Sequence, residues 1–185
     1  MRITTRQISY SAIIAVLYAA VTLLFAPISY GALQFRISEG LMLLAAFTPA
    51  AVPGLYLGCV IANLLGGFGI IDILFGGLAT LLAAYCTYKI SQKTAGMRNR
   101  ILKVFLLPLP TIIFNGLIVG GYLPFVITDP GIGDAGLAAV IAVSVLSVSM
   151  GEAVVTYAVG LPLYYAIKRT AIFGNDGIRD IDTGG

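Results

Sequence analysis

The sequence contains no histidine and no tryptophan, and charged residues make up only 10% of its 185 positions. An ordinary soluble domain carries about 25% charged residues, so this chain is too apolar for a water-soluble fold. Its mean hydropathy of +0.99 and its 59% of hydrophobic residues predict an integral membrane protein. Since a membrane-spanning helix needs roughly 20 apolar residues, the chain is long enough for about six spans with short connections.

The same shortages exclude several classes of active site. Without histidine, no Cys/His metal cluster can form. The two cysteines, Cys59 and Cys86, lie in separate apolar segments, and we expect both to be small packing residues. The sequence has no GxxxxGK[ST] phosphate loop, so this chain is not expected to hydrolyse ATP. No Ser/His or Cys/His pair is available for a hydrolase. We therefore expect neither a metal nor another cofactor.

Proline and glycine divide the apolar sequence into six predicted helices. These cover about residues 8–26, 35–47, 54–65, 72–90, 104–125 and 136–168, and the second is short for a full span. The stretch 89–103 is polar enough for a water-exposed loop. We expect one all-α domain over residues 1–173, an integral membrane six-helix bundle, followed by a polar, flexible tail over 174–185.

Basic residues test this layout independently. Cytoplasmic loops carry an excess of Lys and Arg, and six spans with both termini in the cytoplasm place the main basic groups on that side. These are Arg2 and Arg6, then Lys89, Lys93, Arg98, Arg100 and Lys103, and finally Lys168 and Arg169. The even number of spans and the charge distribution agree, which favours cytoplasmic N- and C-termini.

Three acidic residues, Glu39, Asp72 and Glu152, lie inside or at the edge of the apolar segments, where a charge costs on the order of 3 kcal/mol. Such residues usually face a partner or a wet cavity. Helical spacing brings them to a similar depth with other polar groups, so we predict a substrate pocket that opens outward. Its predicted members are Gln34, Arg36, Glu39, Asn63, Asp72, Asn115, Tyr122 and Glu152.

Each of these residues also has a purely structural explanation. Arg36 and Glu39 could form an ion pair, and Asp72 could cap a helix after a run of glycines. Asn63 and Asn115 could bond neighbouring helices, and tyrosines often serve packing. Glu152 is the hardest to explain in this way, because it is a lone carboxylate inside a long apolar helix.

Small residues recur every four positions along the first predicted helix, at Ser11, Ala15 and Ala19. Such a strip lets another helix approach closely. The approaching helix could belong to a partner protein or to this bundle, since Gly54 and Gly58 have the same spacing.

Four segments together resemble the QueT family of substrate-binding S components, which serve energy-coupling factor (ECF) transporters for queuosine precursors. They are APISYG at 26–31, QFRISE at 34–39, GCVIANL at 58–64 and DILFG at 72–76. The likeness extends over about residues 5–170, with its strongest motifs in the first half.

The resemblance implies a six-helix S component of the prokaryotic plasma membrane that is not an enzyme and has no nucleic acid partner. It would bind queuine or a related 7-deazaguanine from outside, then dock on an ECF module made of a coupling membrane protein and two ATPases. In that setting Ser11, Ala15 and Ala19 would meet the coupling protein. Carboxylates would accept the N–H donors of the base and of an ammonium tail, and the sequence leaves open which carboxylate takes which.

Three alternatives remain open from the sequence. An S component for another vitamin-like heterocycle could use the same polar residues. A small intramembrane enzyme could act on a lipid through Glu39 and Glu152, and a stand-alone facilitator or channel subunit would transport without ATP.

Overall fold

The computed structural model of the protein describes residues 4–29, 35–67, 69–126 and 136–170, and the regular structure in these ranges is helical. The segments in chain order are α1 (Thr5–Leu24), α2 (Ala26–Ser29), η1 (Ile37–Ala46), α3 (Ala51–Gly66), η2 (Asp72–Gly76), α4 (Gly77–Lys93), α5 (Arg100–Leu106), α6 (Leu109–Phe114), η3 (Asn115–Val119), α7 (Gly120–Val126), α8 (Leu137–Val155), η5 (Thr156–Gly160) and α9 (Leu161–Thr170). The predicted site residue Gln34 and the predicted tail 174–185 lie outside the described residues.

Several of these segments run on from one another as longer helices. Within the described ranges, four helices are long and apolar enough to cross a membrane: Thr5–Leu24, Asp72–Lys93, Ile101–Val126 and Leu137–Thr170. Two shorter apolar helices, Ile37–Ala46 and Ala51–Gly66, complete the arrangement. The predicted all-α structure is thus confirmed for the described residues, and it contains four candidate membrane spans.

The outer surface of the long helices is apolar. Leu24, Val16, Val143 and Met150, for example, are 74%, 66%, 66% and 69% exposed. In an 18-residue apolar window of each candidate span, at most 39% of the residues are buried inside the protein. A water-soluble protein rarely exposes apolar area on this scale, and a lipid environment would remove it from water.

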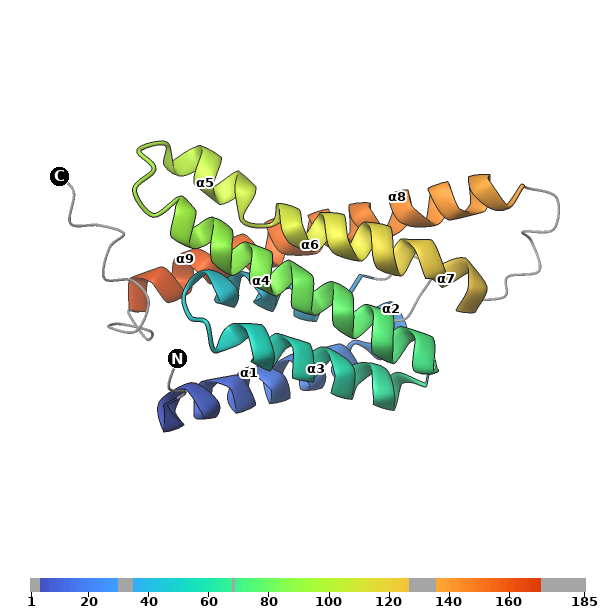
Figure 1. Ribbon diagram of the computed structural model, residues 1–185, viewed down its shortest axis with the longest axis horizontal. Helices are drawn as coiled ribbons and strands as arrows, with labels where there is room; N and C mark the ends of the chain where they lie inside the picture. Colours follow the sequence, from blue (N-terminus) through green and yellow to red (C-terminus); the bar gives the residue numbers. More distant parts are fainter. Residues whose placement is uncertain (1–3, 30–34, 68, 127–135, 171–185) are drawn as a thin grey trace.

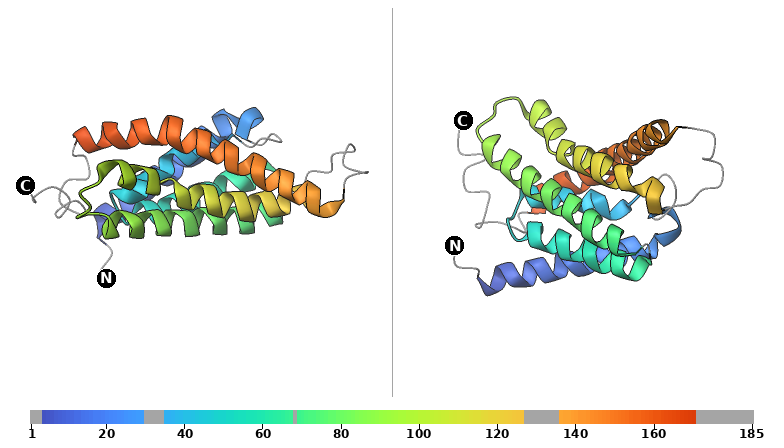
Figure 2. Two further views of the ribbon diagram at one scale, coloured as in Figure 1. Left: turned by 90° about the horizontal axis from the view of Figure 1, so that it is seen from above. Right: turned by 45° about the vertical axis from the view of Figure 1, so that its right-hand side comes forward.

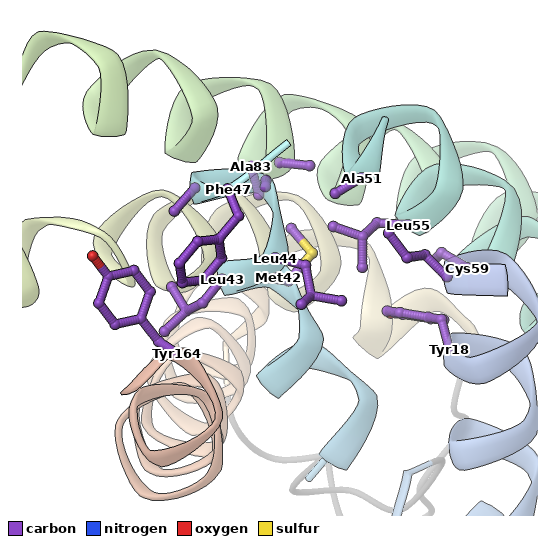
Figure 3. Close-up of a cluster of buried hydrophobic side chains, with 14 of the residues drawn as sticks. Tyr18, Met42, Leu43, Leu44, Phe47, Ala51, Leu55, Cys59, Ala83 and Tyr164 are labelled. Carbon is purple, nitrogen blue, oxygen red and sulfur yellow. The ribbon is translucent and has the colours of Figure 1, made fainter. Parts of the chain in front are cut away.

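The short helix η1 lies at the centre of the bundle. Met42, Leu43, Leu44 and Ala45 follow one another in sequence, and none is more than 6% exposed, so every side of the helix is covered. Figure 3 shows Met42, Leu43 and Leu44 among side chains of the surrounding helices, with Tyr18 and Leu55 on one side and Tyr164 on the other. The rings of Phe47 and Tyr164 pack with centroids 4.8 Å apart. The second half of η1, residues 41–46, is apolar on all sides, as expected of a helix in such a buried position.

The basic stretch 89–103 differs from its predicted loop. Helix α4 continues to Lys93 and α5 begins at Arg100, so only residues 94–99 connect them. Asn99 caps α5 by accepting a hydrogen bond from the backbone N–H of Leu102. The prediction missed α5 because the stretch is rich in basic residues. The helix nevertheless has an exposed apolar face, formed by Ile101 and Phe105.

The two ends of the bundle differ in the segments they carry. Helix α1 begins and α9 ends at the same end of the protein, where α4 is also connected to α5 (Figures 1 and 2). The helix ends that meet there carry basic residues: Arg6 is in the first turn of α1, Lys93 ends α4, Arg98 lies between α4 and α5, and Lys168 is in the last turn of α9. Helices α3 and η2 meet at the opposite end, which brings Asn63 and Asp72 toward that side.

The small-residue strip of α1 is covered by α3 of the same chain. Ala15 and Ala19 are only 5% and 7% exposed, and the Ser11 hydroxyl donates a hydrogen bond of 2.7 Å to the carbonyl oxygen of Ala50. A Cβ atom at Gly58 would lie 2.8 Å from the carbonyl oxygen of Ala15. Of the two occupants that the sequence left open, the described structure shows α3 of this bundle packed on the strip, where Gly54 and Gly58 allow the close approach.

Candidate functional site

Nine polar side chains from seven helical segments meet beside the apolar core. They are Tyr18 of α1, Arg36 and Glu39 at the start of η1, Cys59 and Asn63 of α3, Asp72 of η2, Asn115 of η3, Tyr122 of α7 and Glu152 of α8. We call this set the polar cluster. All except Tyr122, which is partly buried, are at most 4% exposed. Polar groups buried so deeply need partners, so their hydrogen bonds define the cluster.

Helix η1 carries Glu39 into the middle of the bundle, next to α1. The Tyr18 hydroxyl donates a hydrogen bond to Oε1 of Glu39. One turn further along α1, the Thr22 and Ser38 hydroxyls lie 2.6 Å apart. These contacts fix the start of η1 against α1 and hold one oxygen of the Glu39 carboxylate.

The carboxylate of Glu152 is held from the other side by Asn115, whose Nδ2 donates to Oε1 of Glu152 at 2.9 Å. Close packing makes this contact feasible, because a side chain at Gly116 would overlap the Ser149 hydroxyl on α8. Asn115 thus holds one oxygen of the Glu152 carboxylate, as Tyr18 holds one oxygen of the Glu39 carboxylate.

A second pair of charges lies toward the η2 end of the cluster. Nη2 of Arg36 is 3.5 Å from Oδ1 of Asp72, and the Tyr122 hydroxyl donates to the same oxygen at 2.5 Å. Nη1 of Arg36 lies 3.9 Å from Sγ of Cys59. Arg36 and Asp72 are 4% and 2% exposed, which makes this a buried ion pair. The sequence-based alternative, that Arg36 pairs with Glu39 three residues on, is not the ion pair observed.

Asn63 reaches the same place from α3. Its Nδ2 donates to the backbone carbonyl oxygen of Asp72 at 2.8 Å and lies 3.6 Å from the Cys59 sulfur. This approach needs a glycine at position 76, because a Cβ there would lie only 2.7 Å from Nδ2 of Asn63 and 3.2 Å from the Tyr122 hydroxyl. Gly76 is thus the residue that lets Asn63, Asp72 and Tyr122 converge.

Within the described residues, three π-helical turns interrupt the long helices, at η2, η3 and η5. Two of them begin at members of the polar cluster, Asp72 and Asn115, and the third begins at Thr156, whose hydroxyl donates to the carbonyl oxygen of Glu152 at 2.6 Å. π-Helical turns are frequent at functional sites, where the extra residue redirects a side chain. Here each widened turn adjoins a side chain that points into the cluster.

Several oxygen atoms of the carboxylates and amides in the cluster can still accept a hydrogen bond. Within the described part of the chain, five buried oxygens of the cluster have no hydrogen-bond partner: Glu39 Oε2, Asn63 Oδ1, Asp72 Oδ2, Asn115 Oδ1 and Glu152 Oε2. The amide donors of both asparagines are already engaged. Burying an acceptor without a partner costs about 1–3 kcal/mol, so the set is suited to a molecule rich in N–H donors.

Comparison with known proteins supplies the family. The family model described as "QueT transporter" matches residues 8–169. The chain belongs to the QueT family. The resemblance seen in the sequence motifs is therefore confirmed, and it places the protein among transporters.

One curated relative within the QueT family extends the comparison. The "Queuosine precursor transporter QueT" of Lactococcus lactis subsp. cremoris is 40% identical over 80 residues, which is 42% of this chain and 47% of the relative. The chain thus spans about half the length of the curated relative it matches. No solved structure matches the chain significantly.

For this QueT-family chain, sequence reasoning selected most of the residues that the fold brings together. Seven of the eight predicted pocket residues, all but Gln34, lie in the polar cluster. Sequence reasoning missed Tyr18, and it interpreted Cys59 only as a packing residue. Tyr18 shares the inward face of α1 with Ala15 and Thr22, so the helical face was readable, but its partner Glu39 lies 21 residues away.

Proposed function

We propose that the protein is the substrate-binding S component of an ECF-type transporter, and that it captures a queuosine precursor of the 7-deazaguanine class from outside the cell. Uptake would be driven by ATP through a separate module of a coupling membrane protein and two ATPases. Membership of the QueT family supports the transport role, and the name of the Lactococcus relative supports the substrate class.

The observation that carries the proposal is the set of five unpartnered acceptor oxygens in the polar cluster. A 7-deazaguanine presents N–H donors on its pyrimidine edge, on its exocyclic amine and on its pyrrole ring. Carboxylate and amide oxygens are the natural partners for such donors. A bound base would therefore relieve the cost of leaving these acceptors without partners.

A purely structural role explains the polar cluster less well. The Arg36–Asp72 pair and the Tyr18–Glu39 bond would be adequate as internal bridges between helices. Structural networks in a protein interior are generally satisfied within themselves. Unpartnered oxygens on both Glu39 and Glu152 fit a binding site that is completed by its ligand.

The same proposal gives the chain an orientation. The end at which α1 begins and α9 ends carries the basic residues that flank the membrane, and the positive-inside rule assigns that end to the cytoplasm. Asn63 and Asp72, near the opposite end, would then face the outside. The four candidate spans and the two shorter apolar helices, η1 and α3, support the six-helix arrangement of this proposal.

Two measurements test the proposed function. The purified full chain in lipid nanodiscs should bind one molecule of 7-aminomethyl-7-deazaguanine in a calorimetric titration. Liposomes that contain this chain alone should bind the compound without accumulating it, because the sequence carries no phosphate loop. Accumulation by the chain alone would instead identify a facilitator, and absence of binding would reject the proposed substrate class.

A further inference from the structure

The polarity of helix α5 is the reverse of that expected for a surface helix in water. Ile101, Leu102 and Phe105 are 72%, 46% and 57% exposed, whereas Lys103 of the same helix is only 7% exposed. The three apolar residues share one face, because positions three and four apart are neighbours on a helix. Figure 1 shows α5 at the margin of the bundle, next to its connection with α4. This exposed face suits an apolar environment and not water.

Contacts with two neighbouring helices fix the orientation of α5. The Tyr157 hydroxyl of η5 donates a hydrogen bond of 3.0 Å to the carbonyl oxygen of Phe105, and the two rings lie with centroids 5.7 Å apart. The Thr87 hydroxyl of α4 donates to the carbonyl oxygen of Leu107 at 3.2 Å. The next residue, Pro108, has no N–H group and interrupts the helix, and the two side chains tie α5 to the bundle across this break. The apolar face is therefore a fixed part of the fold.

Exposed basic residues precede this face along the chain. Lys89 and Lys93 are one helical turn apart near the end of α4, and Arg98 lies in the connection 94–99 that leads to α5. The Lys89 ammonium is 5.4 Å from the centroid of the exposed Tyr85 ring. Every acidic side chain in the described part of the chain belongs to the polar cluster, where it is buried. No described carboxylate therefore balances the positive charge at this end of the bundle.

From these observations we propose that α5 and the end of α4 bind an anionic phospholipid. Lys89, Lys93 and Arg98 contact its phosphate headgroup, and Ile101, Leu102 and Phe105 contact its acyl chains. We call these six residues the lipid surface. An anionic phospholipid combines the two properties that the surface requires, since it has apolar chains and a negative headgroup that attracts Lys and Arg residues next to the membrane. The proposal goes beyond the proposed function and does not depend on the transported substrate.

The place of the lipid surface between two candidate spans favours a lipid over a water-soluble occupant. Lys93 ends the candidate span Asp72–Lys93, and Ile101 begins the candidate span Ile101–Val126. The ends of membrane-spanning helices lie where hydrocarbon gives way to headgroups, and basic side chains near these ends extend toward the headgroups. A soluble acidic protein would match the cations, but hydrocarbon would still cover Ile101 and Phe105 at this depth.

The absence of tryptophan from the sequence allows a direct test. Phe105→Trp places a single indole on the lipid surface, and the control Val143→Trp places one on α8, where Val143 is 66% exposed. Each variant is placed in phosphatidylcholine nanodiscs that contain the same small fraction of brominated phosphatidylglycerol, which is anionic, or of brominated phosphatidylcholine. The brominated phosphatidylglycerol should quench the fluorescence of Phe105→Trp about twofold more strongly than the brominated phosphatidylcholine does. Both lipids should quench Val143→Trp equally.

Removal of charge tests the headgroup contact. In the Phe105→Trp chain, the combined changes Lys89→Gln, Lys93→Gln and Arg98→Gln should bring quenching by the two lipids close to equality. A preference that persists in this variant would overturn the assignment of the three cations. Equal quenching of Phe105→Trp with the cations in place would overturn the proposal and leave the basic residues to a protein partner.

A measurement on the wild-type chain keeps the proposal testable if a variant fails to fold. Native mass spectrometry of the chain released from nanodiscs with equal amounts of phosphatidylglycerol and phosphatidylcholine should show more bound phosphatidylglycerol. Equal retention of the two lipids, or an excess of phosphatidylcholine, would contradict the proposal.

Discussion

Nδ2 of Asn115 donates a hydrogen bond of 2.9 Å to Oε1 of Glu152 across the contact between η3 and α8. The two residues are 37 positions apart, and both are buried, with 3% and 4% of their surfaces exposed. This bond leaves Oδ1 of Asn115 and Oε2 of Glu152 without partners in the described part of the chain. It thereby fixes the orientation of two acceptors toward the place where we propose that the ligand binds.

Asn115→Leu should weaken binding of 7-aminomethyl-7-deazaguanine by about tenfold or more, because it removes one acceptor and releases the Glu152 carboxylate. Calorimetry on the nanodisc-embedded chain measures the change. Leu117→Ala is the matched control, since Leu117 belongs to the same π-helical turn and is 62% exposed. Equal affinity of Asn115→Leu and the wild type would remove Asn115 from the site.

Tyr18→Phe tests a residue that sequence reasoning did not select. The substitution removes the hydroxyl that donates to Glu39 and leaves the ring in place, so ligand affinity should fall severalfold with little loss of thermal stability. Tyr157→Phe is the control, because the Tyr157 hydroxyl donates to the carbonyl oxygen of Phe105 outside the cluster. A larger loss of affinity in the control than in Tyr18→Phe would contradict the placement of Tyr18.

The Arg36–Asp72 pair yields a prediction about stability. Removing one partner of a buried ion pair typically costs about 3–5 kcal/mol, because the other charge is left uncompensated. Arg36→Gln should therefore lower the melting temperature of the ligand-free chain, and the double variant Arg36→Gln/Asp72→Asn should recover part of the loss. If the two single changes are simply additive in the double variant, the pair is not energetically coupled.

Gly58 tests the close contact between α1 and α3. A Cβ at this position would lie 2.7 Å from the Cβ of Tyr18 and 2.8 Å from the carbonyl oxygen of Ala15, so Gly58→Ala should destabilise the chain by about 1–3 kcal/mol. Gly121→Ala is the control, because nothing lies within 4 Å of its Cβ position in α7. Thermal unfolding that is unchanged in Gly58→Ala would show that α1 and α3 separate easily.

The helical segments followed from proline, glycine and hydropathy because these properties act locally. The predicted second helix at 35–47 corresponds to η1, but sequence alone left its position open. A helix that is apolar on every side has no periodic pattern to distinguish a lipid-facing element from a central one. The structure shows the central position, because Met42 and Leu43 pack in the main hydrophobic core.

The sequence predicted most of the residues in the polar cluster, but it did not predict which of them bond to each other. Carboxylates and amides in an apolar segment stand out because their burial is costly, which identified Glu39, Asn115 and Glu152 one by one. Pairing depends on which helical faces meet, so Arg36 bonds Asp72 rather than Glu39. Gly54 and Gly58 have the same four-residue spacing as Ser11 and Ala15. In the structure these glycines pack against the strip on α1.

Membrane orientation can be tested with single cysteines at opposite ends. Met97 and Ile70 are 37% and 65% exposed, and Cys86→Ala provides the background because Cys59 is buried. In intact cells, an impermeant maleimide should label Ile70→Cys and should label Met97→Cys only after the cells are opened. The reverse pattern would place the basic end of the bundle outside.

Native mass spectrometry tests the polar cluster as a ligand site most directly. The wild-type chain, incubated with 7-aminomethyl-7-deazaguanine and then freed of excess compound, should carry an added mass of one ligand. The Glu39→Gln/Glu152→Gln double variant should carry none while keeping its fold. A wild-type chain without the added mass, or a double variant that retains it, would contradict the assignment of the polar cluster as the substrate site.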